Sequence, residues 1–162
     1  MRTAKSRMWT CALVVSMAVA GIGVSGAAQA KDGFGVRLGT GYGMGLQSGG
    51  GGGIGFLGEF AMRSSSMEYG LGWLMQPVGT GSTSNLIGGV FRYYMSDAFA
   101  IGLDVGYAMF TGVSGLFFGA NAGYGFKLSD AMTLTPGLRF NYAMITPATP
   151  VLNFHLALGY HF

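Results

Sequence analysis

The segment Phe34–Leu46 reads FGVRLGTGYGMGL and decides the fold class. Mostly apolar side chains such as Phe34, Leu38 and Tyr42 occupy every second position, and Gly or Arg37 fills the positions between them. A period of two residues is typical of a β-strand, because successive side chains point to opposite faces. The many glycines also exclude a stable helix. The segment therefore predicts a strand with one apolar face and one small or polar face.

The same alternation recurs along the rest of the chain. Wherever a charged residue falls inside such a segment, it lies on the face opposite to the apolar one. The recurrence predicts seven further strands, around Ile54–Met62, Tyr69–Met75, Ile87–Tyr93, Phe99–Met109, Phe118–Leu128, Met132–Met144 and Leu152–Phe162.

The connections between these strands alternate in length. Short turns are expected at Arg63–Ser66, Ser96–Ala98 and Ser129–Ala131. Longer loops are expected at Gln47–Gly53, Gln76–Asn85, Thr111–Gly115 and Ile145–Pro150. Short periplasmic turns and longer extracellular loops alternate in this way in outer-membrane barrels.

The composition indicates a surface that does not face water. Only 9% of the 162 residues are charged, whereas a soluble domain carries roughly 25%. The non-apolar strand faces are mostly Gly, so they are poorly suited to a water-facing surface. We therefore expect the apolar faces to point outward to lipid, where every backbone polar group must be paired and a sheet must close. The predicted fold class is all-β: an eight-stranded antiparallel up-and-down transmembrane β-barrel.

The N-terminal segment 1–30 has the pattern of a cleavable signal peptide. Basic residues precede an apolar run, and the small-residue site Ala28-Gln29-Ala30 predicts cleavage after Ala30. The alternative is a retained membrane anchor. Cleavage leaves a barrel domain over 31–162 with equal numbers of basic and acidic residues, because Arg2, Lys5 and Arg7 carry the net charge of +3. We therefore expect no nucleic-acid partner.

The last predicted strand carries the most specific pattern in the chain. It ends FHLALGYHF, an alternating strand with a terminal aromatic residue and another aromatic two positions earlier. This end resembles the assembly signal of bacterial outer-membrane proteins, with the outward residues Phe154, Leu156, Leu158, Tyr160 and Phe162. Residues 31–162 resemble the small barrels of the OmpA-transmembrane-domain and OmpX type. The resemblance implies an outer-membrane location, lipid and the outer-membrane assembly machinery as partners, and periplasmic termini. We expect a monomer.

The inward positions hold nearly all the chemistry of the barrel domain. An eight-stranded barrel is just wide enough for side chains to fill its interior or for one small ligand. We expect a polar network inside the lumen, formed by Arg37, Glu59, Arg63, Glu68, Arg92, Asp104, Asn121, Arg139, Asn141, Asn153 and His155. The hairpin registers predict a chain of pairs Arg63–Glu68–Arg92–Asp104, with Arg139 near Asn121 and His155 in the outer half.

A structural or interaction role with a polar plug in the lumen is the expected function. The inward glycines fit either close backbone approach or an open lumen, so a narrow small-solute pore or a small-ligand-binding barrel stays an alternative. A lipid-modifying enzyme is less favoured, because His155 and His161 both face inward and the serines cluster in turns and loops. We expect no catalytic residues and no cofactor. We also expect no metal, since the two histidines lack a third ligand.

Overall fold

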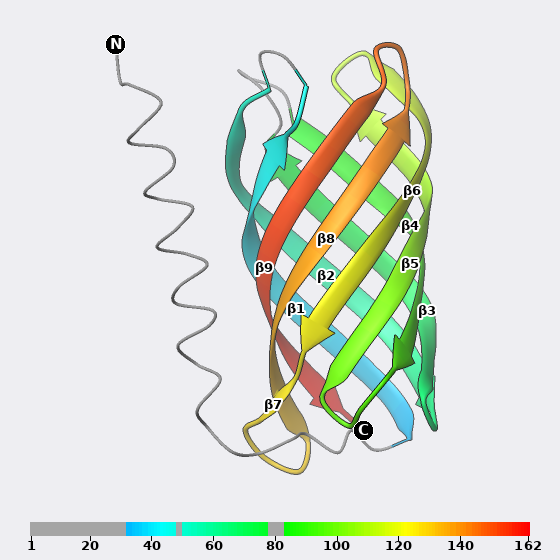
Figure 1. Ribbon diagram of the computed structural model, residues 1–162, viewed down its shortest axis with the longest axis vertical. Helices are drawn as coiled ribbons and strands as arrows, with labels where there is room; N and C mark the ends of the chain where they lie inside the picture. Colours follow the sequence, from blue (N-terminus) through cyan, green and yellow to red (C-terminus); the bar gives the residue numbers. More distant parts are fainter. Residues whose placement is uncertain (1–31, 48–49, 78–82) are drawn as a thin grey trace.

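A computed structural model describes residues 32–47, 50–77 and 83–162, and these residues form a closed antiparallel β-barrel (Figure 1). Its strands are β1 (Gly33–Gly45), β2 (Gly52–Ser64), β3 (Met67–Pro77), β4 (Thr83–Tyr94), β5 (Phe99–Phe110), β6 (Val113–Tyr124), β7 (Phe126–Lys127), β8 (Met132–Met144) and β9 (Thr149–His161). The expected signal peptide and its cleavage site lie outside the described residues. Within the described ranges, no helix is long and apolar enough to cross a membrane.

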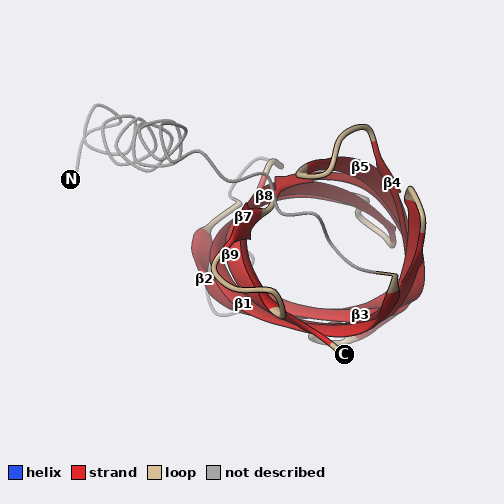
Figure 2. Ribbon diagram, turned by 90° about the horizontal axis from the view of Figure 1, so that it is seen from below, coloured by secondary structure: helices blue, strands red, loops and turns tan. Residues whose placement is uncertain are grey.

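The barrel closes because its first and last strands pair. Successive strands are hydrogen-bonded to one another, except that β6 and β7 both pair with β8. The first strand, β1, pairs with β9 over the register Gly35↔His161 to Gly45↔Val151. Figure 2 shows the resulting ring along the barrel. Closure removes the free strand edges that an open sheet would expose. The predicted eight-stranded up-and-down barrel is confirmed.

Nine strand segments form eight barrel positions, because β6 and β7 are two parts of one strand. Both pair with β8, through Gly123↔Gly137 and Phe126↔Leu134, in one unbroken register. Continuing that register places Tyr124 opposite Pro136, which has no backbone N–H to donate. A proline inside a sheet therefore interrupts the ladder at this point.

The side chains are arranged with the apolar ones outside. Leu71 and Leu103, in the middle of their strands, are 68% and 63% exposed, whereas Arg92 is 8% exposed. Aromatic residues also point outward near both ends of the barrel, and they include Phe34, Tyr69, Phe99 and Tyr160 at one end and Tyr42, Trp73, Tyr107 and Phe118 at the other. The inverted pattern expected from the alternation is confirmed.

One expectation about the connections is wrong. The turns between β2 and β3 and between β4 and β5 lie at the barrel end that holds the C-terminus (Figure 1). At the opposite end, the β5–β6 connection is only Thr111-Gly112 rather than a longer loop over 111–115. Gly112 makes this tight turn possible because its φ of 82° lies in the left-handed region. Short and long connections therefore do not alternate strictly.

The outward face predicts a position-dependent cost for a charge. Leu103→Arg should lower the free energy of unfolding in lipid bilayers by about 2–4 kcal/mol, because it places a cation near the middle of the apolar face. Ser64→Arg, at the turn end of β2, should cost no more than about 1 kcal/mol. Denaturant unfolding in vesicles, followed by Trp73 fluorescence, measures both. Equal free-energy costs at the two positions would contradict the conclusion that the outward face of the barrel contacts lipid.

Candidate functional site

The lumen is filled by two groups of side chains. A charged cluster lies toward the turn end and consists of Arg37, Glu59, Glu68, Arg92, Tyr94, Asp104, Asn121 and Arg139. An apolar cluster lies between it and the loop end and consists of Leu57, Leu74, Leu86, Ala108, Phe117, Ala143 and Ala157. Both clusters arise from the inward positions of the same strands.

Glu59 is the centre of the charged cluster. Its carboxylate lies 2.6 Å from Arg92 Nη2, 2.5 Å from Arg139 Nη2 and 3.3 Å from Arg37 Nη1. The three guanidinium groups come from β4, β8 and β1, so this one carboxylate joins strands on different sides of the barrel. Burial of a charge is costly unless it is paired, and Glu59 is paired with three cations.

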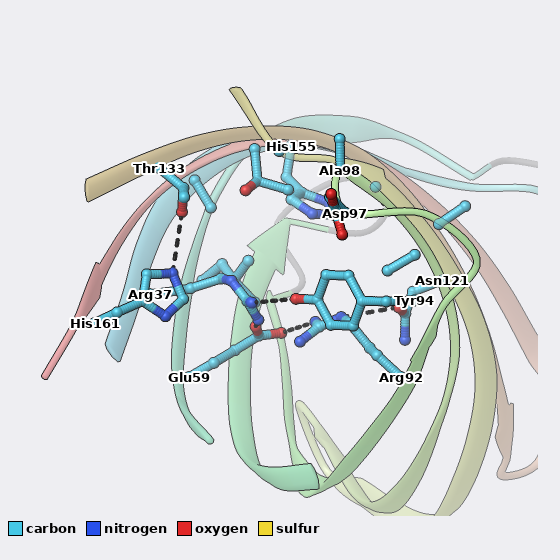
Figure 3. Close-up of a pocket in the computed structure, with 17 residues that line it drawn as sticks. Arg37, Glu59, Arg92, Tyr94, Asp97, Ala98, Asn121, Thr133, His155 and His161 are labelled. Atoms are coloured by element: carbon cyan, nitrogen blue, oxygen red, sulfur yellow. Dashed lines mark hydrogen bonds and ion pairs between the residues drawn. The ribbon is translucent and has the colours of Figure 1, made fainter. Parts of the chain in front are cut away.

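Glu68 is held almost as completely. Arg37 donates through Nη1 and Nη2 to its two oxygens, each at 2.5 Å, in the two-pronged geometry that suits arginine and a carboxylate. Arg92 Nη1 donates to it at 2.7 Å. The Tyr94 hydroxyl donates to Glu68 and accepts from Arg37, each at 2.9 Å. Figure 3 shows Tyr94 and Arg37 pointing toward one another in the lumen.

Asp104 and Asn121 complete the cluster. Asn121 Nδ2 donates to Asp104 at 3.0 Å, and its Oδ1 accepts from Arg92 Nε at 3.1 Å. Arg139 Nε lies 3.1 Å from the other oxygen of Asp104. The predicted direct Arg92–Asp104 pair is therefore wrong, because Asn121 stands between the two groups and links them.

The predicted Arg63–Glu68 pair is also absent from the described ion pairs. The two residues are cross-strand partners, but Arg37 occupies both oxygens of Glu68. Arg63 instead donates through Nε to the Ser65 carbonyl at 3.0 Å, and its guanidinium lies 3.6 Å from the centre of the Tyr94 ring. A cation stacked on an aromatic face in this way gains a modest stabilisation.

Asn141, Asn153 and His155 lie around this cluster rather than in it. Arg139 belongs to the cluster, so the prediction that it lies in a separate polar group in the outer half is wrong. Arg139 is the cross-strand partner of both Asn121 and Asn153, as the register argument requires, but its ion pairs are to Glu59 and Asp104 and not to His155. Asn153 Nδ2 donates to Gln76 at 3.0 Å. Asn141 is fully buried, and neither polar atom of its side chain has a hydrogen-bond partner among the described residues.

Sequence reasoning missed Tyr94 and the apolar cluster. Tyr94 shares the parity of Arg92 on β4, so the two-residue period could have placed it inside. Leu57 and Leu74 likewise share the parity of Glu59 and Gln76. The sequence does not single them out, because most leucines in the strands lie on the outward face. The interior is accordingly part polar and part apolar, and the expectation of a wholly polar lumen is corrected.

The inward glycines make room for these side chains. A Cβ added to Gly102 would lie 2.8 Å from Arg92 Cγ, and one added to Gly72 would lie 2.7 Å from Val90 Cγ2. At Gly43, an added Cβ would lie 2.9 Å from the side-chain amide carbon of Gln76. Such distances are closer than real Cβ contacts. Close approach, rather than an open lumen, therefore explains the glycines at these positions.

Three cavities in the lumen are small. A cavity of about 40 Å³ lies beside the charged cluster, and two others of about 10 Å³ each are nearby. About 10–15 Å³ is needed for one water molecule, so the cavity of about 40 Å³ has space for roughly three. Each of these three cavities holds no more than a few water molecules.

Comparisons with known proteins agree on the fold. No family model and no curated protein sequence matches the chain. Solved structures do match. Neisserial surface protein A matches with a TM-score of 0.63 and 14% sequence identity, over 80% of this chain and 97% of that chain. Ail, the attachment invasion locus protein of Yersinia pestis, matches with a TM-score of 0.60 and 11% identity, over 82% of this chain and 100% of that chain. The outer membrane protein OprG from Pseudomonas aeruginosa matches with a TM-score of 0.56 and 12% identity, over 83% of this chain and 99% of that chain. The chain therefore has the fold of a small outer-membrane β-barrel protein. These matches do not show a specific relation to the OmpA or OmpX type.

The charged cluster predicts unequal costs for two arginine substitutions. Arg92→Met should lower the free energy of unfolding by roughly 3–5 kcal/mol, because it removes a partner from two buried carboxylates. Arg63→Met is the matched control and should cost less, since Arg63 makes no ion pair among the described residues. Denaturant unfolding of both variants in the same lipid vesicles measures the difference. A cost for Arg63→Met equal to that of Arg92→Met would contradict the assignment.

Proposed function

We propose that this chain is a non-conducting outer-membrane barrel protein with a structural or interaction role. The single observation that carries the proposal is the filled lumen: a buried ion-pair cluster and an apolar cluster lie one above the other across the barrel. A solute would have to displace both. The outward apolar face is the lipid-facing surface that such a protein needs.

An interaction role fits the way the barrel is built. With the lumen filled, binding to partners is left to the loops and to the rims of the barrel. One structural neighbour, Ail, is named an attachment invasion locus protein, and that name supports an attachment role by analogy alone. We propose that the protein is a monomer, because the closed sheet has no strand edge to share with a second copy.

The OmpA/OmpX-like resemblance and the cleaved signal peptide belong to the same proposal. So do contact with outer-membrane lipid and insertion by the outer-membrane assembly machinery. The apolar outer surface supports contact with lipid, and the outward residues of the last strand support insertion by the assembly machinery. Leu156, Leu158, Tyr160 and Phe162 are all exposed on that face, and Phe154 shares their parity.

We further propose that the protein is not an enzyme. The histidines that could serve a Ser–His pair, His155 and His161, line the lumen cavity rather than the outer surface where lipid substrates lie. Mass spectrometry of lipid A from cells with and without the protein tests this. A mass change that depends on expression would overturn it.

Electrical recording tests the filled lumen. The purified full-length protein, inserted into planar bilayers, should give no discrete conductance steps, because both clusters block the lumen. A general porin recorded in the same bilayers is the positive control for insertion and detection. Reproducible ohmic steps from the barrel would favour the narrow-pore alternative and contradict the proposal.

Deletion of Phe162 tests the proposed assembly signal. The variant should reach the outer membrane at a reduced level and leave protease-sensitive protein in the periplasm. Fractionation and heat-modifiable migration on gels measure both effects. Phe99→Ala, which removes an outward aromatic residue from an internal strand, is the control and should assemble better than the deletion variant. Normal assembly of the deletion variant would refute the signal.

A further inference from the structure

The methionines of the described chain lie only near the two ends of the barrel. Residues 32–47, 50–77 and 83–162 contain eight of them, and none lies in the middle third of a strand. The four strands that run toward the loop end each carry one at or within two residues of their last position (Figure 1): Met44, Met75, Met109 and Met144. We call these four the loop-end methionines. Each follows an outward aromatic residue by two positions, in the pairs Tyr42–Met44, Trp73–Met75, Tyr107–Met109 and Tyr142–Met144.

Polar neighbours place Met109 beside lipid headgroups rather than beside acyl chains. Asn85 and Ser114 are its cross-strand partners on the two sides. Both point outward, because Asn85 accepts a hydrogen bond from Trp73 Nε1 at 3.3 Å and Ser114 shares one with the Tyr107 hydroxyl at 2.8 Å on the exposed surface. Amide and hydroxyl groups are costly in hydrocarbon, and Trp and Tyr gather at the membrane–water interface. Water therefore reaches the barrel at this level.

The methionine sulfur atoms are the groups of the barrel domain that an oxidant attacks most readily. Residues 31–162 contain no cysteine, because Cys11 lies in the N-terminal segment. Oxidation turns the apolar thioether into a polar sulfoxide, which disrupts a packed core. At the loop end, water can hydrate the sulfoxide instead. Met109 and Met144 are 37% and 58% exposed, whereas Met44 and Met75 are half-buried, so the first two should react before the others.

From these observations we propose that the loop-end methionines are a modification site, where a small hypohalous acid oxidises the thioether to a sulfoxide while the barrel stays folded. The sulfur lone pair attacks the halogen, and hydroxide leaves. Water then adds to the sulfur, halide departs and the two protons of that water are lost, one of them to the hydroxide. The sulfur loses two electrons and the halogen gains them. This inference goes beyond the proposed function, because a filled barrel does not need an oxidation site.

The reaction should depend on depth in the membrane. Its first step separates a halosulfonium cation from hydroxide, and hydrocarbon cannot solvate these charges as water does. Leu103 lies in the middle of the apolar face and is 63% exposed. Leu103→Met introduces a thioether there with little change in volume. In lipid, the introduced methionine should therefore react severalfold more slowly than Met109 in the same chain.

Site-resolved oxidation tests this expectation. The folded Leu103→Met variant in lipid nanodiscs is treated with limiting hypochlorous acid, and peptide mass spectrometry follows sulfoxide formation at each methionine with time. Met109 and Met144 should gain oxygen severalfold faster than the introduced methionine. The same variant dissolved in denaturant is the control, because unfolding removes the difference in depth. There, all three methionines should react at similar rates.

A second variant tests whether the barrel tolerates the modification. In this variant leucine replaces all four loop-end methionines. At complete oxidation it should take up four fewer oxygen atoms per chain than the wild-type protein, because those sulfur atoms are absent. Both proteins should keep heat-modifiable migration on gels after treatment, since the sulfoxides of the wild-type protein lie where water hydrates them.

Two results would overturn the proposal. One is an introduced methionine that oxidises in nanodiscs as quickly as Met109. The other is oxidation that abolishes heat-modifiable migration of the wild-type protein but not of the four-leucine variant. Neither result bears on conductance, so failure of the modification site and failure of the non-conducting role are separate outcomes.

Discussion

Pairing of the backbone within a lipid layer is the constraint on which the rest of this structure depends. Lipid offers no hydrogen-bond partners, so each strand must satisfy its N–H and C=O groups on both neighbours. The register between β1 and β9 meets this requirement by closing the sheet. The hydrogen bonding of β8 to β6 and β7 is interrupted near Pro136, which has no N–H to donate. Closure also forces one face of every strand inward, and a narrow lumen follows.

The narrow lumen explains why the interior chemistry is so dense. Inward side chains from opposite sides of an eight-stranded barrel can meet, so Glu59 on β2 reaches arginines on β1, β4 and β8. Glycines at positions such as Gly72 and Gly102 provide the space that these long side chains occupy. The cluster thus ties together strands that are not hydrogen-bonded to one another. A buried ion pair of this kind is costly to break, although its net contribution to stability can be small.

The two clusters divide the lumen by chemistry. The charged cluster lies toward the turns and leaves a small cavity, whereas the apolar cluster around Leu57, Leu74 and Phe117 lies toward the loops. An apolar layer of this kind excludes water from one side of the ion pairs, which strengthens electrostatic interactions within them. The closed lumen is therefore a consequence of how these two clusters pack.

The two-residue period, together with the low charge content, determined the fold class and the inward or outward direction of residues such as Asp104 and Leu103, because a strand alternates its faces whatever its neighbours are. The predicted hairpin register also brought Arg92 near Glu68, although it set Glu68 opposite Tyr93, and in the structure Glu68 lies directly opposite Arg92. Only the tertiary structure decided that Arg139 pairs with Glu59, 80 residues away in the chain, and that Asn121 separates Arg92 from Asp104. Contacts across the lumen depend on barrel diameter, strand tilt and side-chain reach, and none of these is encoded in the spacing of residues along one strand.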